Sequence, residues 1–147
     1  MSAIDATGNM FGYNVGAYVN PVNTVGVMGS GLALVFARKY PKMAENYKRA
    51  CDVGELEIGT VHVWTAPTGR RIVNLPTKRH WKDPSTLEYV TSGVNALAEA
   101  LGRMEVRSVA IPALGCGLGG LEWDDVYPII RGTFVHSPVT AYVFPPQ

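Results

Sequence analysis

The chain alternates short apolar runs with longer segments in which apolar residues recur every three or four positions. The first pattern is typical of buried β-strands and the second of amphipathic helices. We expect strands at residues 4–7, 17–20, 61–65, 72–75, 106–112 and 139–144. We expect helices that begin near Leu32, Pro41 and Asp83, and a last helix from Trp123 to about Gly132. This alternation of strands and helices predicts an α/β domain.

The segment after Asp83 predicts the longest helix of the chain. Pro84 suits the first turn, and Ser85 is followed by Glu88 at the spacing of a capping box. The apolar stripe of this helix consists of Leu87, Val90, Val94, Leu97 and Leu101. Such a stripe indicates a helix packed on a core. Because the expected strands are apolar on both sides, we expect helices on both faces of the sheet.

Composition and charge narrow the class of protein. The 147 residues fit one domain over residues 1–147, and the hydrophobic content of 47% and charged content of 17% are those of a globular protein. A net charge of +1 gives no overall attraction to nucleic acid, so any basic site is local. We find no membrane-spanning run and no secretion signal, and therefore expect a cytoplasmic protein without membrane contact.

Cysteine and histidine usage adds two expectations. Cys51 and Cys116 lie far apart in the sequence and form no CxxC motif, which is typical of reduced thiols in the cytoplasm. The three histidines are scattered and show no metal-ligand spacing. We therefore expect no metal site.

Two glycine-rich loops each follow an expected strand and precede an expected helix. The first, Gly26–Gly31, lies within NPVNTVGVMGSG, and the second, Gly115–Gly120, reads GCGLGG. Glycine lets the backbone approach a ligand closely, and a helix that starts at such a loop directs free amide groups at an anion. A single loop of this kind could be only a tight turn, but two of them can hold a diphosphate between them.

Neither loop fits the common nucleotide-binding motifs. A P-loop has a lysine and a serine or threonine directly after its last glycine. Here Leu32 follows Gly31, and Leu121 follows Gly120. The G-x-G-x-x-G fingerprint of dinucleotide-binding folds fits neither loop. The sequence therefore disfavours both a P-loop and a Rossmann site.

Three segments carry a resemblance to a known family. They are NPVNTVGVMGSGLAL (20–34), NLPTKRHW (74–81) and AIPALGCGLGGLEWDDV (110–126). In order and spacing they resemble the macro domain, the ADP-ribose-binding fold, over nearly the whole chain. PTKRHW and GCGLGGLEW are similar to the DarG-type subgroup, which removes ADP-ribose from thymidine bases of DNA and reverses the action of DarT toxins.

The resemblance implies a three-layer α/β/α sandwich with a mixed, roughly six-stranded sheet. It implies an ADP-ribosyl glycohydrolase that acts on ADP-ribosylated, single-stranded DNA without a cofactor, as a monomer, with a DarT-type toxin as its functional counterpart. Two alternatives stay open. One is a reader that binds ADP-ribose without turnover, and the other is a hydrolase of acyl-linked ADP-ribose, such as glutamyl esters on protein or O-acetyl-ADP-ribose.

By resemblance, Lys78 and Asn23 are the candidate catalytic residues. Lys78 matches the lysine of the subgroup and has two open roles: a Schiff base with an opened ribose, or electrostatic stabilisation of developing charge. Asn23 is expected at the distal ribose, because an amide both donates and accepts hydrogen bonds. The other residues expected to bind ADP-ribose are Asn9, Met10, Asn20, Thr24, Gly26, Met28, Gly29, Ser30, Gly31, Leu32, Thr77, Leu114, Gly115, Cys116, Gly117, Leu118, Gly119 and Gly120.

The segment after Lys78 mixes basic and aromatic residues. Arg79, His80 and Trp81 suit a DNA strand, because phosphates pair with the charges and a base can stack on the indole. The alternative for Trp81 is a core anchor with its N–H at the surface.

Two positions depart from the family pattern. Asn9 stands where macro domains usually have an aspartate that contacts the adenine amino group, so we expect a weaker adenine preference, and Phe11 or Tyr13 could offer another face to the base. Gly119 stands where related human-type glycohydrolases have an aspartate. We can assign no pair of glycosidase carboxylates, because the acidic residues that follow suit a helix start better than catalysis. They are Glu122, Asp124 and Asp125.

Overall fold

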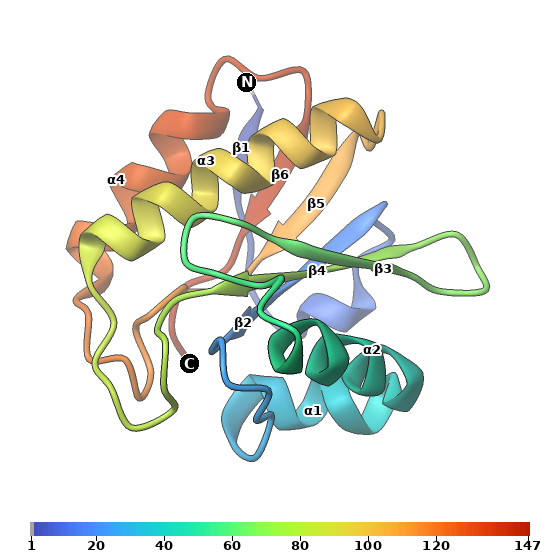
Figure 1. Ribbon diagram of the computed structural model, residues 1–147. Helices are drawn as coiled ribbons and strands as arrows, with labels where there is room; N and C mark the ends of the chain where they lie inside the picture. Colours follow the sequence, from blue (N-terminus) through green and yellow to red (C-terminus); the bar gives the residue numbers. More distant parts are fainter. Residues whose placement is uncertain (1) are drawn as a thin grey trace.

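The computed structural model describes residues 2–147 and forms a six-stranded sheet with the order β1-β6-β5-β2-β4-β3 (Figure 1). The strands are β1 (Ala3–Asp5), β2 (Ala17–Val22), β3 (His62–Thr65), β4 (Arg71–Pro76), β5 (Ser108–Ile111) and β6 (Thr140–Val143). All neighbouring strands are parallel except β3 and β4, which form an antiparallel hairpin. The expected mixed sheet is confirmed.

Helices cover both faces of this sheet, as expected (Figure 1). They are α1 (Gly31–Lys39), α2 (Pro41–Asp52), α3 (Leu87–Arg103), α4 (Trp123–Phe134) and the 3-10 helix η1 (Met10–Gly12). Successive residues of β2 point to opposite faces. Val19 therefore packs in the core under α3 and α4, and Tyr18 in the core under α1 and α2. No helix among residues 2–147 combines the length and apolar character needed to cross a membrane.

The start of α3 differs from the expectation. The helix begins at Leu87, and its N-cap is Thr86, whose Oγ1 accepts a hydrogen bond from the Tyr89 amide at 3.1 Å. The predicted Ser85–Glu88 capping box is therefore wrong by one residue. Ser85 is held outside the helix because its amide donates to the Gly119 carbonyl oxygen at 3.0 Å and its side chain is buried.

Other element boundaries shift by a few residues. β2 continues to Val22, since its pairing with β4 runs through Pro76. α4 continues past Gly132 to Phe134. The short helix η1 was not predicted, and it is capped by Asn9, whose Oδ1 accepts from the Phe11 amide at 3.0 Å.

The strand order brings the two glycine loops together. β2 and β5 are parallel neighbours, so the loops that follow them leave the same edge of the sheet. The chain then continues into α1 on one face and into α4 on the other (Figure 1). Where the connections after two neighbouring parallel strands run to opposite faces, a crevice opens at the edge of the sheet. Such switch points are the usual ligand sites of α/β sheets.

A chain of polar side chains crosses the sheet beside the first glycine loop. Asn20 Nδ2 donates to Asn74 Oδ1 at 3.0 Å, and Asn74 Nδ2 donates to His62 Nδ1 at 2.9 Å. His62 Nε2 lies 2.7 Å from Asn46 Oδ1. Because Asn74 donates to Nδ1, the imidazole is neutral and carries its proton on Nε2. Burial lowers the pKa of His62, which favours the same neutral form.

We predict that the free energy of unfolding falls as the pH drops below about 6.5, the ordinary pKa of histidine. Since the pKa of His62 is lowered in the folded chain, the unfolded chain binds the proton first, and stability rises with pH from the folded pKa up to the unfolded one. Denaturant titrations between about pH 5 and 8 measure this dependence. His62→Gln should flatten it and His136→Gln should not; a slope unchanged in His62→Gln would contradict the prediction.

Candidate functional site

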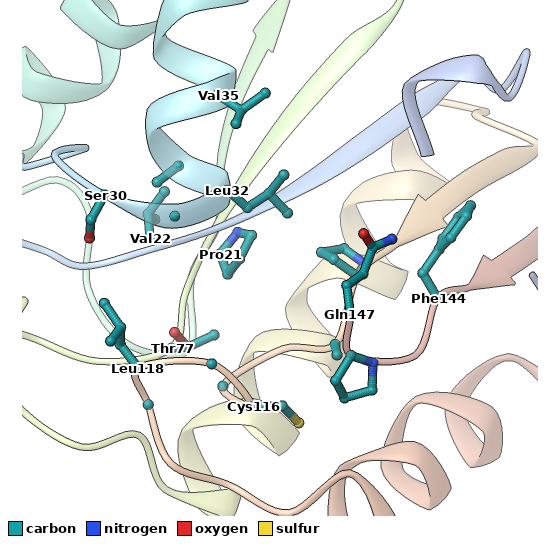
Figure 2. Close-up of a pocket in the computed structure, with 18 of the residues that line it drawn as sticks. Pro21, Val22, Ser30, Leu32, Val35, Thr77, Cys116, Leu118, Phe144 and Gln147 are labelled. Atoms are coloured by element: carbon teal, nitrogen blue, oxygen red, sulfur yellow. The ribbon is translucent and has the colours of Figure 1, made fainter. Parts of the chain in front are cut away.

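A cavity of about 1130 Å³ opens at the carboxyl edge of the sheet, between the loops that follow β2 and β5. Pockets for cofactor-sized molecules typically measure about 300–1,000 Å³, so this space suits a ligand as large as a dinucleotide. In Figure 2, Ser30, Thr77 and Leu118 lie toward one end, and Phe144 and Gln147 lie toward the other, with Pro21 between them. Segments far apart in the sequence therefore share one site.

Lys78 is the only charged side chain among the described residues that line this cavity. It is half-buried, and its Nζ donates a hydrogen bond to the Trp81 carbonyl oxygen at 3.1 Å. The ion pairs among residues 2–147 lie elsewhere, so no carboxylate neutralises it. The other side chains of the described lining are uncharged, so Lys78 is free to attract an anionic ligand.

The acidic residues considered from the sequence lie outside the cavity. Asp124 and Asp125 occupy the first turn of α4, and Glu122 is its N-cap. None of the three lines the pocket. Their position fits the favourable interaction of carboxylates with the positive end of the helix dipole.

The first glycine loop presents the start of α1 to the cavity. Ser30 is the N-cap, but its side chain makes no capping hydrogen bond. Gly31, Leu32 and Ala33, which form the first turn, all line the cavity. The amide groups of a first turn have no partner within the helix, so they are available to a phosphate.

Asn23 lines the cavity, but it is only 5% exposed, and its side chain is hydrogen-bonded to other residues of the protein. Its Oδ1 accepts from the amides of Val25 and Val27 at 3.1 and 3.3 Å and from the Tyr47 hydroxyl at 2.8 Å. Its Nδ2 donates to the Val27 carbonyl oxygen at 2.8 Å. The oxygen is therefore occupied by the protein, and one N–H of the amide remains for a ribose hydroxyl.

The second glycine loop packs against the segment that precedes α3. Gly115 has a φ of 73°, and a Cβ there would lie 2.8 Å from Leu121 Cδ1 and 3.2 Å from Ser85 Cβ. Only glycine combines this backbone conformation with this close approach.

Cys116 lines the cavity, but burial raises the pKa of its thiol, so it stays protonated at neutral pH and is a poor nucleophile.

The other end of the cavity contains residues that the sequence did not indicate. Phe144, Pro145, Pro146 and Gln147 line it, and Gln147 Nε2 donates to the Gly8 carbonyl oxygen at 3.1 Å. These residues follow β6, which reaches the same edge because it pairs in parallel with β5. The order of the strands would have been needed to predict that these residues line the cavity.

Most residues predicted from the sequence lie in the cavity wall. They are Asn9, Met10, Asn23, Gly29, Ser30, Gly31, Leu32, Thr77, Lys78, Trp81, Gly115, Cys116, Gly117, Leu118 and Gly119, and Phe11 joins them. Tyr13 does not line the cavity and packs instead on Tyr142 and Phe144. At 47% exposure, Trp81 is not a core anchor.

The remaining predicted residues lie outside the wall. Asn20 and Leu114 are fully buried and do not line the cavity, so nothing in the structure places them at a ligand. Asn20 instead bonds to Asn74 within the sheet. Outside the lining are also Thr24, Gly26, Met28, Gly120, Arg79 and His80.

Comparisons with known proteins agree with this geometry. The Macro domain family model matches residues 19–130. A DNA ADP-ribosyl glycohydrolase of Mycobacterium tuberculosis is 42% identical over 147 residues, which cover 96% of this chain and 41% of that protein. The chain thus spans about two fifths of the length of this curated relative.

Solved structures extend the likeness to three dimensions. The macrodomain of Mycobacterium tuberculosis DarG superimposes with a TM-score of 0.96 at 40% identity, covering 99% of this chain and 98% of that one. Thermosipho africanus DarTG in complex with ADP-ribose gives a TM-score of 0.88 at 33% identity, covering 95% of this chain and 40% of that one. With its sheet, its two glycine loops and the matched residues 19–130, the chain belongs to the macro domain family.

Proposed function

We propose that this macro domain is a DNA ADP-ribosyl glycohydrolase, which cleaves the N-glycosidic bond between ADP-ribose and a thymine base of single-stranded DNA. The observation that carries the proposal is Lys78, the one charged side chain in a cavity whose described lining contains no acidic side chain. The similarity to a protein named DNA ADP-ribosyl glycohydrolase supports the same activity. In this role the glycine loops bind the diphosphate, and Asn9, Met10 and Phe11 lie at the adenine end.

The reaction joins a water oxygen to the anomeric carbon while the bond to the thymine nitrogen breaks and that nitrogen takes a proton. Ordinary glycosidases use two carboxylates for these transfers. Lys78 offers two routes instead. Its amine can bond to the anomeric carbon of the opened ribose as thymine leaves, and water then hydrolyses the imine and restores the lysine. Alternatively, its ammonium group stabilises the developing negative charge.

We further propose that a DarT-type DNA ADP-ribosyl transferase is the functional counterpart, and that the domain acts as a monomer in the cytoplasm, in repair of modified DNA. The likeness to Thermosipho africanus DarTG supports the pairing. Arg79 and Lys82 are exposed and each adjoins a cavity-lining residue in the chain, Lys78 and Trp81 respectively, and Lys82 Nζ lies 4.8 Å from the centre of the Trp81 ring. These charges can meet the phosphates that flank a modified base.

The second glycine loop has no room for an acidic side chain at Gly119. A Cβ on this residue would collide with Ser85 Oγ and lie 2.6 Å from the Gly115 carbonyl oxygen. Since one of these atoms belongs to the backbone, the loop itself would have to move. A carboxylate at this position is thus incompatible with the way Ser85 packs on the loop, which leaves the lysine as the reactive group of the site.

We predict that Lys78→Ala lowers the single-turnover rate on a thymidine-ADP-ribosylated oligonucleotide by about 10²–10³-fold, because the charge or nucleophile is lost. Lys42→Ala, which changes an exposed lysine of α2 outside the cavity lining, should leave the rate unchanged. Release of ADP-ribose as fast as wild type by Lys78→Ala would overturn the mechanism. Two further experiments separate the routes. Borohydride added during the reaction traps a reduced covalent adduct only if an imine forms on Lys78. Lys78→Arg abolishes the imine route but keeps the positive charge that the electrostatic route needs.

The same assay tests the alternatives. If wild type binds ADP-ribose in calorimetry but releases none from DNA, the domain is a reader or acts on another linkage. Release from a glutamyl ester or from O-acetyl-ADP-ribose would then identify an acyl-linked substrate.

We predict that Gly119→Asp destabilises the domain by about 1–3 kcal/mol, the usual cost of overpacking, and brings no gain in turnover. Gly117→Asp is the matched control for stability, because a Cβ on Gly117 meets no atom within 4 Å. Thermal unfolding of the two variants beside wild type measures the difference. Equal melting temperatures for Gly119→Asp and wild type would show that the loop accommodates the side chain.

We predict that Trp81→Ala raises KM for the modified oligonucleotide on the order of tenfold but leaves the affinity for free ADP-ribose unchanged, because base stacking contributes about 1–3 kcal/mol. Trp81→Phe keeps an aromatic face and should recover most of the loss. Steady-state kinetics on DNA and calorimetry with ADP-ribose provide the two readouts. An equal loss in both would show that Trp81 contacts the ADP-ribose rather than the base.

A further inference from the structure

Tyr47 contacts Asn23, at the start of the segment that carries the first glycine loop. It is 1% exposed within α2 and does not line the pocket. Its hydroxyl lies 2.8 Å from the Asn23 carbonyl oxygen and 2.8 Å from Asn23 Oδ1. From sequence it reads as one of the apolar positions of α2, so its polar contact appears only in the fold.

Among residues 2–147, this hydroxyl is the only donor to Asn23 Oδ1 that lies outside the segment connecting β2 to α1. The other two donors, the amides of Val25 and Val27, belong to that connecting segment, and their hydrogen bonds are longer, at 3.1 and 3.3 Å. Donors on the loop can shape it but cannot fix it relative to the rest of the domain. The Tyr47 contact, in contrast, ties the amide of Asn23 to a helix packed in the core.

The environment of Tyr47 keeps its hydroxyl a donor. Burial raises its pKa, so the group retains its proton throughout the working range of the protein. The Asn23 oxygens that face it are acceptors only, which fixes the direction of the hydrogen bond. With Oδ1 facing Tyr47 and Nδ2 bonded to the Val27 carbonyl oxygen, the carboxamide has one orientation.

We propose that Tyr47 is a positioning residue for ligand binding, which acts through Asn23 by holding its carboxamide with the remaining Nδ2 hydrogen directed at the ribose. The ribose oxygen at this place then accepts a hydrogen bond from Asn23. The inference rests on the proposed function for the identity of the ligand, but the contact between Tyr47 and Asn23 does not depend on hydrolysis.

The test compares Tyr47→Phe with Tyr127→Phe. Tyr127 also donates its hydroxyl to a side-chain oxygen, that of Asp5 at 2.6 Å, but outside the cavity lining. Calorimetry should show ADP-ribose affinity weakened about tenfold by Tyr47→Phe and unchanged by Tyr127→Phe, since a buried hydrogen bond is lost only in the first. An affinity equal to wild type in folded Tyr47→Phe overturns the proposal.

A double-mutant cycle separates positioning from general stability. If Tyr47 acts through Asn23, then Tyr47→Phe should weaken ADP-ribose binding no further in an Asn23→Ala background. Fully additive losses would assign Tyr47 a merely structural role and overturn the proposal. The hydrolysis rate on modified DNA is measured in parallel, so a domain that binds ADP-ribose with this coupling but releases none refutes the proposed function and not the inference.

A measurement on the wild-type protein covers the case in which Tyr47→Phe does not fold or ADP-ribose does not bind. In nuclear magnetic resonance spectra, the Tyr47 hydroxyl proton should exchange slowly and show contacts to the Asn23 carboxamide, because it is buried and bonded. Rapid exchange of that proton, or two interconverting orientations of the carboxamide, would refute the positioning role.

Discussion

The parallel pairing of β2 with β5 is the constraint on which the site depends. Ala17 lies opposite Val109 and Tyr18 opposite Ala110, so both strands end at the same edge of the sheet. Their following helices must cover opposite faces, because each face is apolar and needs its own layer. The two glycine loops are left facing each other across the gap, and the cavity is a consequence of the topology.

The two glycine loops are held by different means. Polar contacts hold the first, through the Asn23 carboxamide and the hydroxyl of Tyr47 from α2. Close packing holds the second, because Ser85 fills the space that side chains at Gly115 and Gly119 would need. Ser85 also lies on the segment that connects Lys78 to α3. The segment that carries the lysine therefore packs on the second glycine loop through Ser85.

The electrostatic character of the cavity follows from what lines it. Backbone amides of the first turn of α1 and a single ammonium group form an environment for phosphate groups, without an acidic side chain among the described lining residues. In the proposed reaction a diphosphate brings negative charge and a leaving pyrimidine develops it, and the described lining meets them with positive or neutral side chains. Both the macro domain family of the chain and the lysine in its cavity are thus consistent with the proposed cleavage of an ADP-ribosyl bond.

Local sequence was sufficient for the six strands, the four α-helices, the glycine loops and the lysine segment, but not for the short helix η1. Periodicity, glycine placement and a resemblance carried by contiguous motifs depend only on residues near one another in the chain. The tertiary structure decided the rest. It buried Asn20 and Leu114, exposed Trp81, and brought Phe144 to Gln147 into the wall. It also placed the hydroxyl of Tyr47, a residue that the sequence alone would assign only to the core, where it donates a hydrogen bond to Asn23. These outcomes depend on strand order and on which face each helix covers, and such long-range pairings leave no local pattern in the chain.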